Sequence, residues 1–174
     1  VCSSDLFENF VPVKILMQAD SGLMMICESQ LVNTESSTQP AFSGFGMTAS
    51  SLTITYYHYN EMAMFQFNSN GEIISSNVMI KKQQTENDDG YYSSFCSMIL
   101  PDKIELLYND MVGTQTNVNE FQLTSNGNFQ KQNIFSSEKV GLMIVPKLGK
   151  QVSANELIVP SFQHNYLQFV KFTF

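Results

Sequence analysis

Residues 65–71 read Phe-Gln-Phe-Asn-Ser-Asn-Gly, and residues 121–127 read Phe-Gln-Leu-Thr-Ser-Asn-Gly. The two heptapeptides match at five of seven positions and lie 56 residues apart. Asn-Gly between β-forming flanks predicts a tight two-residue hairpin, because both turn residues then need a positive φ, which Asn and Gly adopt at low cost. Apolar and polar residues alternate in the flanks, as a half-buried strand requires. The repeat therefore predicts antiparallel β-structure.

A second element recurs ahead of the Asn-Gly hairpins. It consists of a short apolar strand, a polar turn and another short apolar strand. We expect the first strand of its three copies at residues 11–17, 95–100 and 142–148, and the second at residues 23–27, 104–108 and 157–159. Each unit thus reads as a four-stranded antiparallel meander, and such repeats of about 40–50 residues are typical of β-propeller blades. The sequence predicts an all-β fold, a partial β-propeller of about three blades at residues 7–174.

The third copy is shorter than the others. Residues 166–174 supply one strand, and the sequence ends where the next Asn-Gly hairpin is expected. Propellers have about four to eight blades, so three are too few to close a ring. We therefore expect the chain to be the C-terminal part of a longer protein. In that protein the strand at residues 169–174 pairs with a segment upstream of residue 7.

The spacing between copies is uneven. Leu23 and Ile104 are 81 residues apart, whereas Ile104 and Leu157 are 53 apart. The excess falls at residues 29–51, which are rich in Ser, Thr and Gly and predict a long flexible loop inserted in the first blade. Residues 81–90 form a second irregular stretch, which we expect to connect the first two blades.

The charge balance excludes several kinds of partner. The chain has nine Lys, no Arg and 16 Asp and Glu, for a formal net charge of −7. Without Arg and without a basic face it lacks the groups that bind phosphates, so we do not expect nucleic acids or anionic membrane surfaces as partners. No apolar run approaches the roughly 20 residues that a membrane helix needs, so we expect no membrane insertion.

The first residues carry no targeting signal. Residues 1–6, Val-Cys-Ser-Ser-Asp-Leu, have no apolar stretch, so no signal peptide is visible. The hexapeptide resembles the translation of a common sequencing-adapter oligonucleotide, and we treat it as non-native; an ordinary mature N-terminus is the alternative. If Cys2 is foreign, Cys27 and Cys96 remain. They are either two small buried hydrophobes or, in an oxidising compartment, a disulfide.

Residues 56–110 resemble a known group of proteins. The segments that carry the resemblance are Tyr-Tyr-His-Tyr-Asn-Glu at residues 56–61, Asn-Gly-Glu-Ile at 70–73, Lys-Lys-Gln-Gln at 81–84, Asn-Asp-Asp-Gly-Tyr-Tyr-Ser-Ser at 87–94 and Leu-Leu-Tyr-Asn-Asp at 106–110. They look like shared segments of uncharacterised bacterial secreted or cell-envelope proteins with β-propeller-like chains. The resemblance covers most of residues 9–174 and implies an extracytoplasmic location. It supplies no catalytic residue, because no activity is established for the group.

The chain departs from that group at two places. Relatives have Asp-Gly-Gly where this chain has Asp20-Ser21-Gly22, and a Trp soon after the Asn-Gly turn where it has Ile74-Ser75. Gly22 retains the flexible position of the first motif. The missing Trp puts in doubt any core contact that depends on an indole.

Residues 86–90, Glu-Asn-Asp-Asp-Gly, concentrate three carboxylates in five positions. Carboxylate oxygens are the ligands that Ca²⁺ prefers, which makes Asp88 and Asp89 weak metal-site candidates. The segment lacks the alternating acidic spacing and the distal Glu of an EF-hand loop. A polar turn between blades is the favoured interpretation, since Asn, Asp and Gly gather in turns for backbone reasons. We expect no cofactor.

Tyrosines cluster at residues 56–59 and 91–92. Tyr combines a broad apolar ring with a polar tip, a combination suited to contact with glycan or peptide. It is equally favoured in strands, so core packing is the alternative, and neighbouring residues of a strand point to opposite faces. Tyr57, Tyr59, Tyr91 and Tyr92 are the ligand-surface candidates.

Together these features favour a non-catalytic binding or scaffold module that recognises a protein or a glycan through the loops connecting its blades. A ligand-free structural spacer is a further reading. The enzymatic alternative is a hydrolase with its active site at the propeller channel or in the missing N-terminal part. His58 and His164 are the only imidazoles, and no Gly-x-Ser-x-Gly elbow is present. Carboxylates gathered with His58 at the channel mouth would favour the enzyme, and Tyr-lined loops around a bare channel would favour binding.

Overall fold

The computed structural model describes residues 9–18, 21–43, 46–112, 115–124, 127–163 and 165–174. Within these ranges the chain is all-β, with antiparallel sheets and one four-residue α-helix. The adapter-like residues 1–6 lie outside the described residues. In the described part, no helix has the length and apolar character needed to cross a membrane.

The N-terminal sheet has four antiparallel strands in the order β1-β2-β5-β6. They are β1 (Phe10–Met17), β2 (Leu23–Ser29), β5 (Glu61–Phe67) and β6 (Ile73–Ile80). In β2 and β5 the alternate residues Met24, Ile26, Met62 and Met64 are buried on one face, and Cys27 and Ala63 between them are buried as well. This is the meander that the sequence predicts, with two further strands inserted between its second and third.

The central sheet repeats this arrangement in the order β8-β9-β10-β11. Its strands are β8 (Cys96–Ile99), β9 (Lys103–Val112), β10 (Gln115–Thr124) and β11 (Phe129–Ser136). The two repeated heptapeptides begin at equivalent places, in the third strand of each sheet. The internal repeat is thus a repeat of whole four-stranded units.

The C-terminal sheet has three strands, β12 (Lys150–Gln151), β13 (Glu156–Gln163) and β14 (Tyr166–Thr173). The first strand expected at residues 142–148 is wrong. Helix α1 (Ser137–Val140), one bridge between Ile144 and Ser161, and the 3-10 helix η2 (Pro146–Leu148) occupy this region. Pro146 has no N–H to donate to a ladder and starts η2 instead, so the edge strand of this sheet forms later, at β12.

The hairpin between β5 and β6 differs from the expected two-residue turn. The Asn68 carbonyl accepts a hydrogen bond from the Gly71 N–H at 3.0 Å, and the Asn68 N–H donates to the Glu72 carbonyl at 2.9 Å. Gly71 has a φ of 82°, whereas Asn70 is not left-handed. The loop therefore contains three residues and ends on a left-handed glycine, a common hairpin geometry. The prediction of positive φ at both Asn and Gly is wrong here.

Two other hairpins have the same hydrogen bonds. The Thr124 carbonyl accepts from Gly127 at 2.9 Å, and the Gln18 carbonyl accepts from Ser21 at 3.1 Å. Gly127 has a φ of 82° and Ser21 one of 64°. Asp20 and Asn126 lie outside the described residues. Each hairpin thus needs one left-handed residue at its third loop position.

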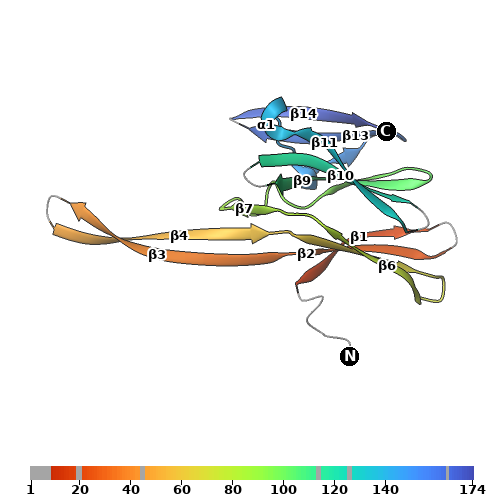
Figure 1. Ribbon diagram of the computed structural model, residues 1–174, viewed down its shortest axis with the longest axis horizontal. Coiled ribbons are helices and arrows are strands. Elements are labelled where there is room, and N and C mark those ends of the chain that lie inside the picture. The colour runs from red at the N-terminus through yellow and green to blue at the C-terminus, as the bar shows by residue number, and fades with distance from the viewer. Residues whose placement is uncertain (1–8, 19–20, 44–45, 113–114, 125–126, 164) are drawn as a thin grey trace.

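A two-stranded hairpin arm occupies the place of the flexible loop expected at residues 29–51. Its strands β3 (Leu31–Ser43) and β4 (Gly46–His58) pair continuously. Figure 1 shows the arm in orange, projecting away from the rest of the molecule. The loop prediction is wrong because the Ser and Thr of this segment form cross-strand pairs, such as Ser36 with Thr53 at 3.1 Å between their hydroxyl oxygens.

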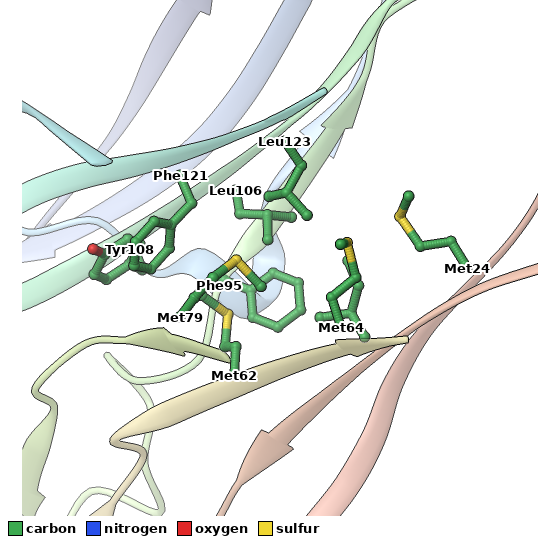
Figure 2. Close-up of a cluster of buried hydrophobic side chains, with 10 residues drawn as sticks. Met24, Met62, Met64, Met79, Phe95, Leu106, Tyr108, Phe121 and Leu123 are labelled. Carbon is green, nitrogen blue, oxygen red and sulfur yellow. The ribbon is translucent and has the colours of Figure 1, made fainter. Parts of the chain in front are cut away.

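The largest core fills the space between the N-terminal and central sheets (Figure 2). The Tyr108 ring stacks on Phe121, with ring centroids 5.0 Å apart. Four methionines contribute thioethers, which adapt to irregular gaps between sheets. The buried residues are Met24, Ile26, Met62, Met64, Met79, Phe95, Leu106, Tyr108, Phe121 and Leu123.

A second core lies between the central and C-terminal sheets. Adjacent β9 residues belong to different cores, Leu106 to the first and Leu107 to the second, so the central sheet is covered on both faces. The N-terminal, central and C-terminal sheets thus form a stack, and the arm strands β3 and β4 belong to a fourth sheet. The second core consists of Cys96, Met98, Leu107, Val118, Ile144, Leu157, Val159 and Phe172.

Both outer faces of the stack are apolar and open. On the N-terminal sheet the exposed side chains are Ile15, Met17, Ile73, Val78 and Ile80, and on the C-terminal sheet they are Phe162, Leu167 and Phe169. Their register partners place each set on one face. Contiguous exposed apolar faces of this kind mark surfaces that contact something else.

The two described cysteines do not form a disulfide. Cys27 and Cys96 are both buried free thiols, on different sheets. Burial raises the pKa of the Cys96 thiol to about 12. Both cysteines are therefore small buried hydrophobes, one of the two alternatives that the sequence left open.

Candidate functional site

The base of the hairpin arm is the point where the arm, the N-terminal sheet and the central sheet meet. The short strand β7 (Gln84–Glu86) pairs with the last residues of β4. Beyond β7, the Asn87 N–H donates to the Thr55 carbonyl and the Asn87 side chain accepts from the Thr55 N–H, both at 2.9 Å. The irregular connection expected at residues 81–90 is thus partly a third strand that fastens the arm.

Asp88 and Asp89 serve the turn that follows β7. Asp88 Oδ1 accepts from the Thr85 hydroxyl at 2.5 Å and from the Gly90 N–H at 2.9 Å, which is an Asx turn. Asp89 Oδ1 accepts from the Tyr57 hydroxyl at 2.8 Å. Asp88 Oδ2 is buried and has no hydrogen bond within the described part of the chain. No three metal-binding side chains gather there or elsewhere among the described residues.

Tyr57 points from the arm toward that turn. Its hydrogen bond to Asp89 raises the pKa of the Tyr57 phenol, with burial and the Asp89 charge adding to the effect. The Tyr57–Asp89 hydrogen bond therefore links the arm to the turn after β7 at the surface, where the arm leaves the stack. Of the candidate tyrosines, Tyr57 is the one carried by the arm itself.

Tyr59 is packed in the interior and offers no ligand surface. It is 7% exposed, and the Lys147 ammonium lies 4.8 Å from its ring centroid and 3.3 Å from its hydroxyl oxygen. Gly90 also approaches the ring so closely that a Cβ there would lie 2.9 Å from a Tyr59 ring carbon. The core alternative holds for this residue.

Tyr91 and Tyr92 form an edge-to-face pair with ring centroids 5.1 Å apart. The Tyr92 hydroxyl donates to the Phe162 carbonyl at 2.7 Å, which ties the connection to the C-terminal sheet. Tyr91 is 39% exposed. Tyr57 and Tyr92 are half-buried and Tyr91 is exposed, so these three candidate tyrosines remain partly open to solvent.

Lys81 is a buried charge at the centre of this junction. Its ammonium lies 2.9 Å from Glu28 Oε1 and donates to the Tyr59 carbonyl at 2.6 Å and to the Gln83 side chain. The side chains of Lys81 and Glu28 are completely buried. Burial lowers the pKa of Lys81 to about 8, and the Glu28 charge opposes the shift.

Gln83 extends this network to the central sheet. Its amide nitrogen donates to the Asn109 carbonyl at 2.8 Å and to the Ser94 carbonyl at 3.0 Å, and its oxygen accepts from the Ser94 N–H at 2.9 Å. In the sequence, Lys81 and Lys82 look like a lone basic pair. In the structure Lys81 and Gln83 are buried and Lys82 between them is exposed, so the two lysines of the pair have different roles.

A cleft of about 440 Å³ opens beside this network at the base of the arm. Its lining mixes polar and apolar surface and carries both charge signs, so it offers hydrogen-bonding groups to a ligand or chain. Its lining residues are His58, Asn60, Glu61, Ile80, Lys81, Lys82, Gln83, Gln84 and Met111.

His58 stands in this cleft without a nucleophile beside it. Its ring lies 6.4 Å from that of Tyr56, and no hydrogen bond joins it to a Ser, Thr or Cys among the described residues. His164 lies outside the described residues. Among the described residues, His58 therefore has no Ser, Thr or Cys nucleophile within hydrogen-bonding contact.

Comparisons with protein-family models, with curated proteins and with solved structures found no match to this chain.

Proposed function

We propose that the protein is a non-catalytic binding or scaffold module that recognises a protein or a glycan with its hairpin arm and the tyrosine-bearing turn at the base of the arm. The observation that carries this proposal is the arm itself. Each of its strands has 13 residues, and the two pair with each other along their whole length, whereas β7 pairs only with the last three residues of β4. An isolated two-stranded ribbon buries little apolar surface and adds little stability. Such an extension is therefore better explained by contact with a partner.

The arm has the chemistry of an adaptable contact surface. Leu31, Val32 and Leu52 are 42%, 54% and 53% exposed among Ser, Thr and Asn side chains. Tyr57, which is half-buried, and Tyr91, which is exposed, add aromatic rings near its base. Uncharged hydroxyl and amide groups hydrogen-bond to sugar or peptide at little desolvation cost compared with charged groups. Together with the resemblance to secreted and envelope proteins, this supports an extracytoplasmic location.

We further propose that the three sheets are blades of a β-propeller. Face-to-face packing of successive meanders, with the first strand of each sheet at one edge, is the arrangement of propeller blades. Additional blades would cover the two open apolar faces. β14 is the edge of a three-stranded sheet where the other sheets have a fourth strand, and a segment upstream of residue 7 would fill that place.

An arm-shortened variant tests the binding role. Glu35 and Ile54 are cross-strand partners, so Asn-Gly can replace residues 36–53 and leave the base of the arm paired with β7. We expect an unchanged melting temperature, because the arm contributes to neither core, and loss of binding on glycan arrays and to isolated bacterial envelopes. Tyr91→Ala, which leaves the arm intact, serves as the matched variant for the turn. Equal binding by the shortened and full-length arms would overturn the proposal, as would a blank result with both.

An N-terminally extended chain tests the propeller assignment. We expect the extension to increase the cooperativity and midpoint of urea unfolding, because it pairs with β14 and covers apolar surface. An extension that leaves unfolding and solubility unchanged would count against the missing strand.

A further inference from the structure

The first strands of the three sheets, β1, β8 and β12, lie at one edge of the stack and line a common cleft of about 290 Å³. We call it the inner-edge cleft. It is separate from the arm and from the cleft that contains His58. Three lysines line it: Lys14 from β1, Lys147 from η2 and Lys150 from β12.

These lysines differ from most others in the chain. Four of the nine lysines, Lys81, Lys103, Lys131 and Lys171, have a carboxylate within 2.9 Å. Lys14, Lys147 and Lys150 have no such partner among the described residues, and no Asp or Glu lines the inner-edge cleft. A chain with a net charge of −7 thus places three of its unpaired cations in one cleft.

The cleft is held in shape by packing and by backbone irregularity. The β1–β2 register shifts between Pro12 and Lys14, and such a bulge re-aims the side chain that follows it. Gly149 lies so close to β8 that a Cβ there would be 2.6 Å from the Cys96 Cβ, which fixes the segment between Lys147 and Lys150. The Lys147 ammonium is steadied on the ring of Tyr59.

Gln151 fastens the two edges together. Its side-chain amide donates to the Ile99 carbonyl at 2.9 Å and accepts from the Ile99 N–H at 3.0 Å, so it bridges β12 and β8 as a further strand residue would. The lysines therefore project from a rigid frame and not from mobile loops. Preorganised charge of this kind loses little entropy when a ligand binds.

We propose that the inner-edge cleft binds a small anion with two or more carboxylate or phosphate groups. Three lysines and no carboxylate line the cleft, so it attracts a multivalent anion, which can accept hydrogen bonds from the ammonium groups. The volume suits a ligand at the small end of the usual range for binding sites. A polymeric nucleic acid is a poor fit, because the chain as a whole carries a net charge of −7.

Calorimetric titration of the 174-residue chain with citrate and, separately, with pyrophosphate tests this proposal. Lys14→Gln and Lys150→Gln should each weaken binding of the preferred anion about tenfold, since each removes a charge-assisted hydrogen bond. Lys139→Gln, an equal charge change on α1 outside the cleft, should leave the affinity unchanged. Lys150→Arg keeps the charge and should retain most of the binding.

Each outcome decides the matter. Preference for citrate assigns a polycarboxylate ligand, and preference for pyrophosphate assigns a phosphate ligand. Absence of heat with both anions at millimolar concentration overturns the site. Equal weakening by Lys139→Gln and Lys150→Gln also overturns it, because the effect would then reflect net charge alone. Anion-dependent melting of each variant confirms that it is folded and reports binding independently of the heat.

Discussion

A single buried ammonium, that of Lys81, joins parts of the chain that are far apart in sequence. It pairs with Glu28 on β2, holds the Tyr59 carbonyl at the end of the arm, and reaches the central sheet through Gln83. A buried ion pair is costly to desolvate, and breaking one side leaves an uncompensated charge. We therefore expect Lys81 to fix the position of the arm relative to the stack and to contribute little to the net free energy of unfolding.

Replacing Lys81 alone should be strongly destabilising. Lys81→Met leaves the Glu28 carboxylate buried without its cation, which we expect to lower the free energy of unfolding by about 3–5 kcal/mol in urea titrations. The double variant Glu28→Gln/Lys81→Met removes both charges and should recover a large part of that loss. A double variant as unstable as Lys81→Met would show that packing, and not charge pairing, dominates at this position.

The pH dependence of stability should carry the signature of Lys81. Its pKa is lowered from 10.5 to about 8 in the folded chain, so between these values the unfolded chain binds more protons than the folded one. Stability from this group therefore rises with pH across that window. We expect the free energy of unfolding, relative to Glu28→Gln/Lys81→Met, to rise by up to about 3 kcal/mol.

The comparison with that variant matters because other groups act in the opposite direction. The pKa values of Cys27 and Cys96 are raised by burial, so their contributions to stability fall as the pH passes their unfolded value of 9.0. Both variants share these groups, and the difference isolates the lysine. A flat difference between pH 8 and 10.5 would contradict the assignment.

At the scale of elements, hairpin loops position the strands that carry the cores. The loops after β5 and β10 have the same hydrogen bonds and the same left-handed glycine, but their surroundings differ. A Cβ on Gly71 would meet nothing within 4 Å. A Cβ on Gly127 would lie 3.0 Å from the Ser75 hydroxyl oxygen and 3.2 Å from Gln66 Oε1, because this loop packs against the N-terminal sheet.

The two glycines should therefore respond unequally to the same substitution. Gly71→Ala adds only backbone strain and should cost about 1–2 kcal/mol of unfolding free energy. Gly127→Ala adds steric contact and should cost more, since it also disturbs the hydrogen bond from the Asn77 side chain to the Gly127 carbonyl at 2.7 Å. Gly71→Asn, a residue that tolerates positive φ, is the control and should cost less than Gly71→Ala. Equal losses for the two alanine variants in urea unfolding would contradict the packing argument.

The elements that the sequence predicts well are those with strong local signals. The strands around the Asn-Gly repeats alternate cleanly, so the two four-stranded sheets are confirmed. The sequence does not predict the arm, because a segment rich in Ser and Thr resembles a loop when its strand pairing is not known. The sequence does not predict the buried Lys81–Glu28 ion pair for a different reason. The two residues are 53 positions apart, and no local pattern encodes their contact.

At the scale of the whole molecule, the two outer sheets of the stack carry apolar faces like those that are buried in its interior. The central sheet is buried on both faces, whereas the N-terminal and C-terminal sheets each present an apolar face to solvent. The alternation of apolar and polar residues in the sequence predicts which strand faces are apolar. It does not predict which of those faces another sheet covers. We expect the open faces to drive self-association of the isolated chain, because burying apolar surface is favourable.

Single charges on the open faces should suppress that self-association. Val78→Lys on the N-terminal sheet and Phe169→Lys on the C-terminal sheet should lower the weight-average mass in sedimentation velocity and leave the unfolding midpoint nearly unchanged. Gln130→Lys, an exposed position of β11, is the matched control with the same charge change. A chain that remains monomeric at high concentration before any substitution would contradict the expectation.

The methionine-rich contact between the N-terminal and central sheets links chemical damage to opening of the stack. Met17 is 75% exposed and should be oxidised to the sulfoxide by peroxide at once. Met62, Met64 and Met79 have no exposed surface, so a peroxide molecule reaches them only when the two sheets separate. The sulfoxide is polar and does not fit back into the core. The pattern of oxidised methionines in a sample would thus record how often each molecule's sheets had come apart.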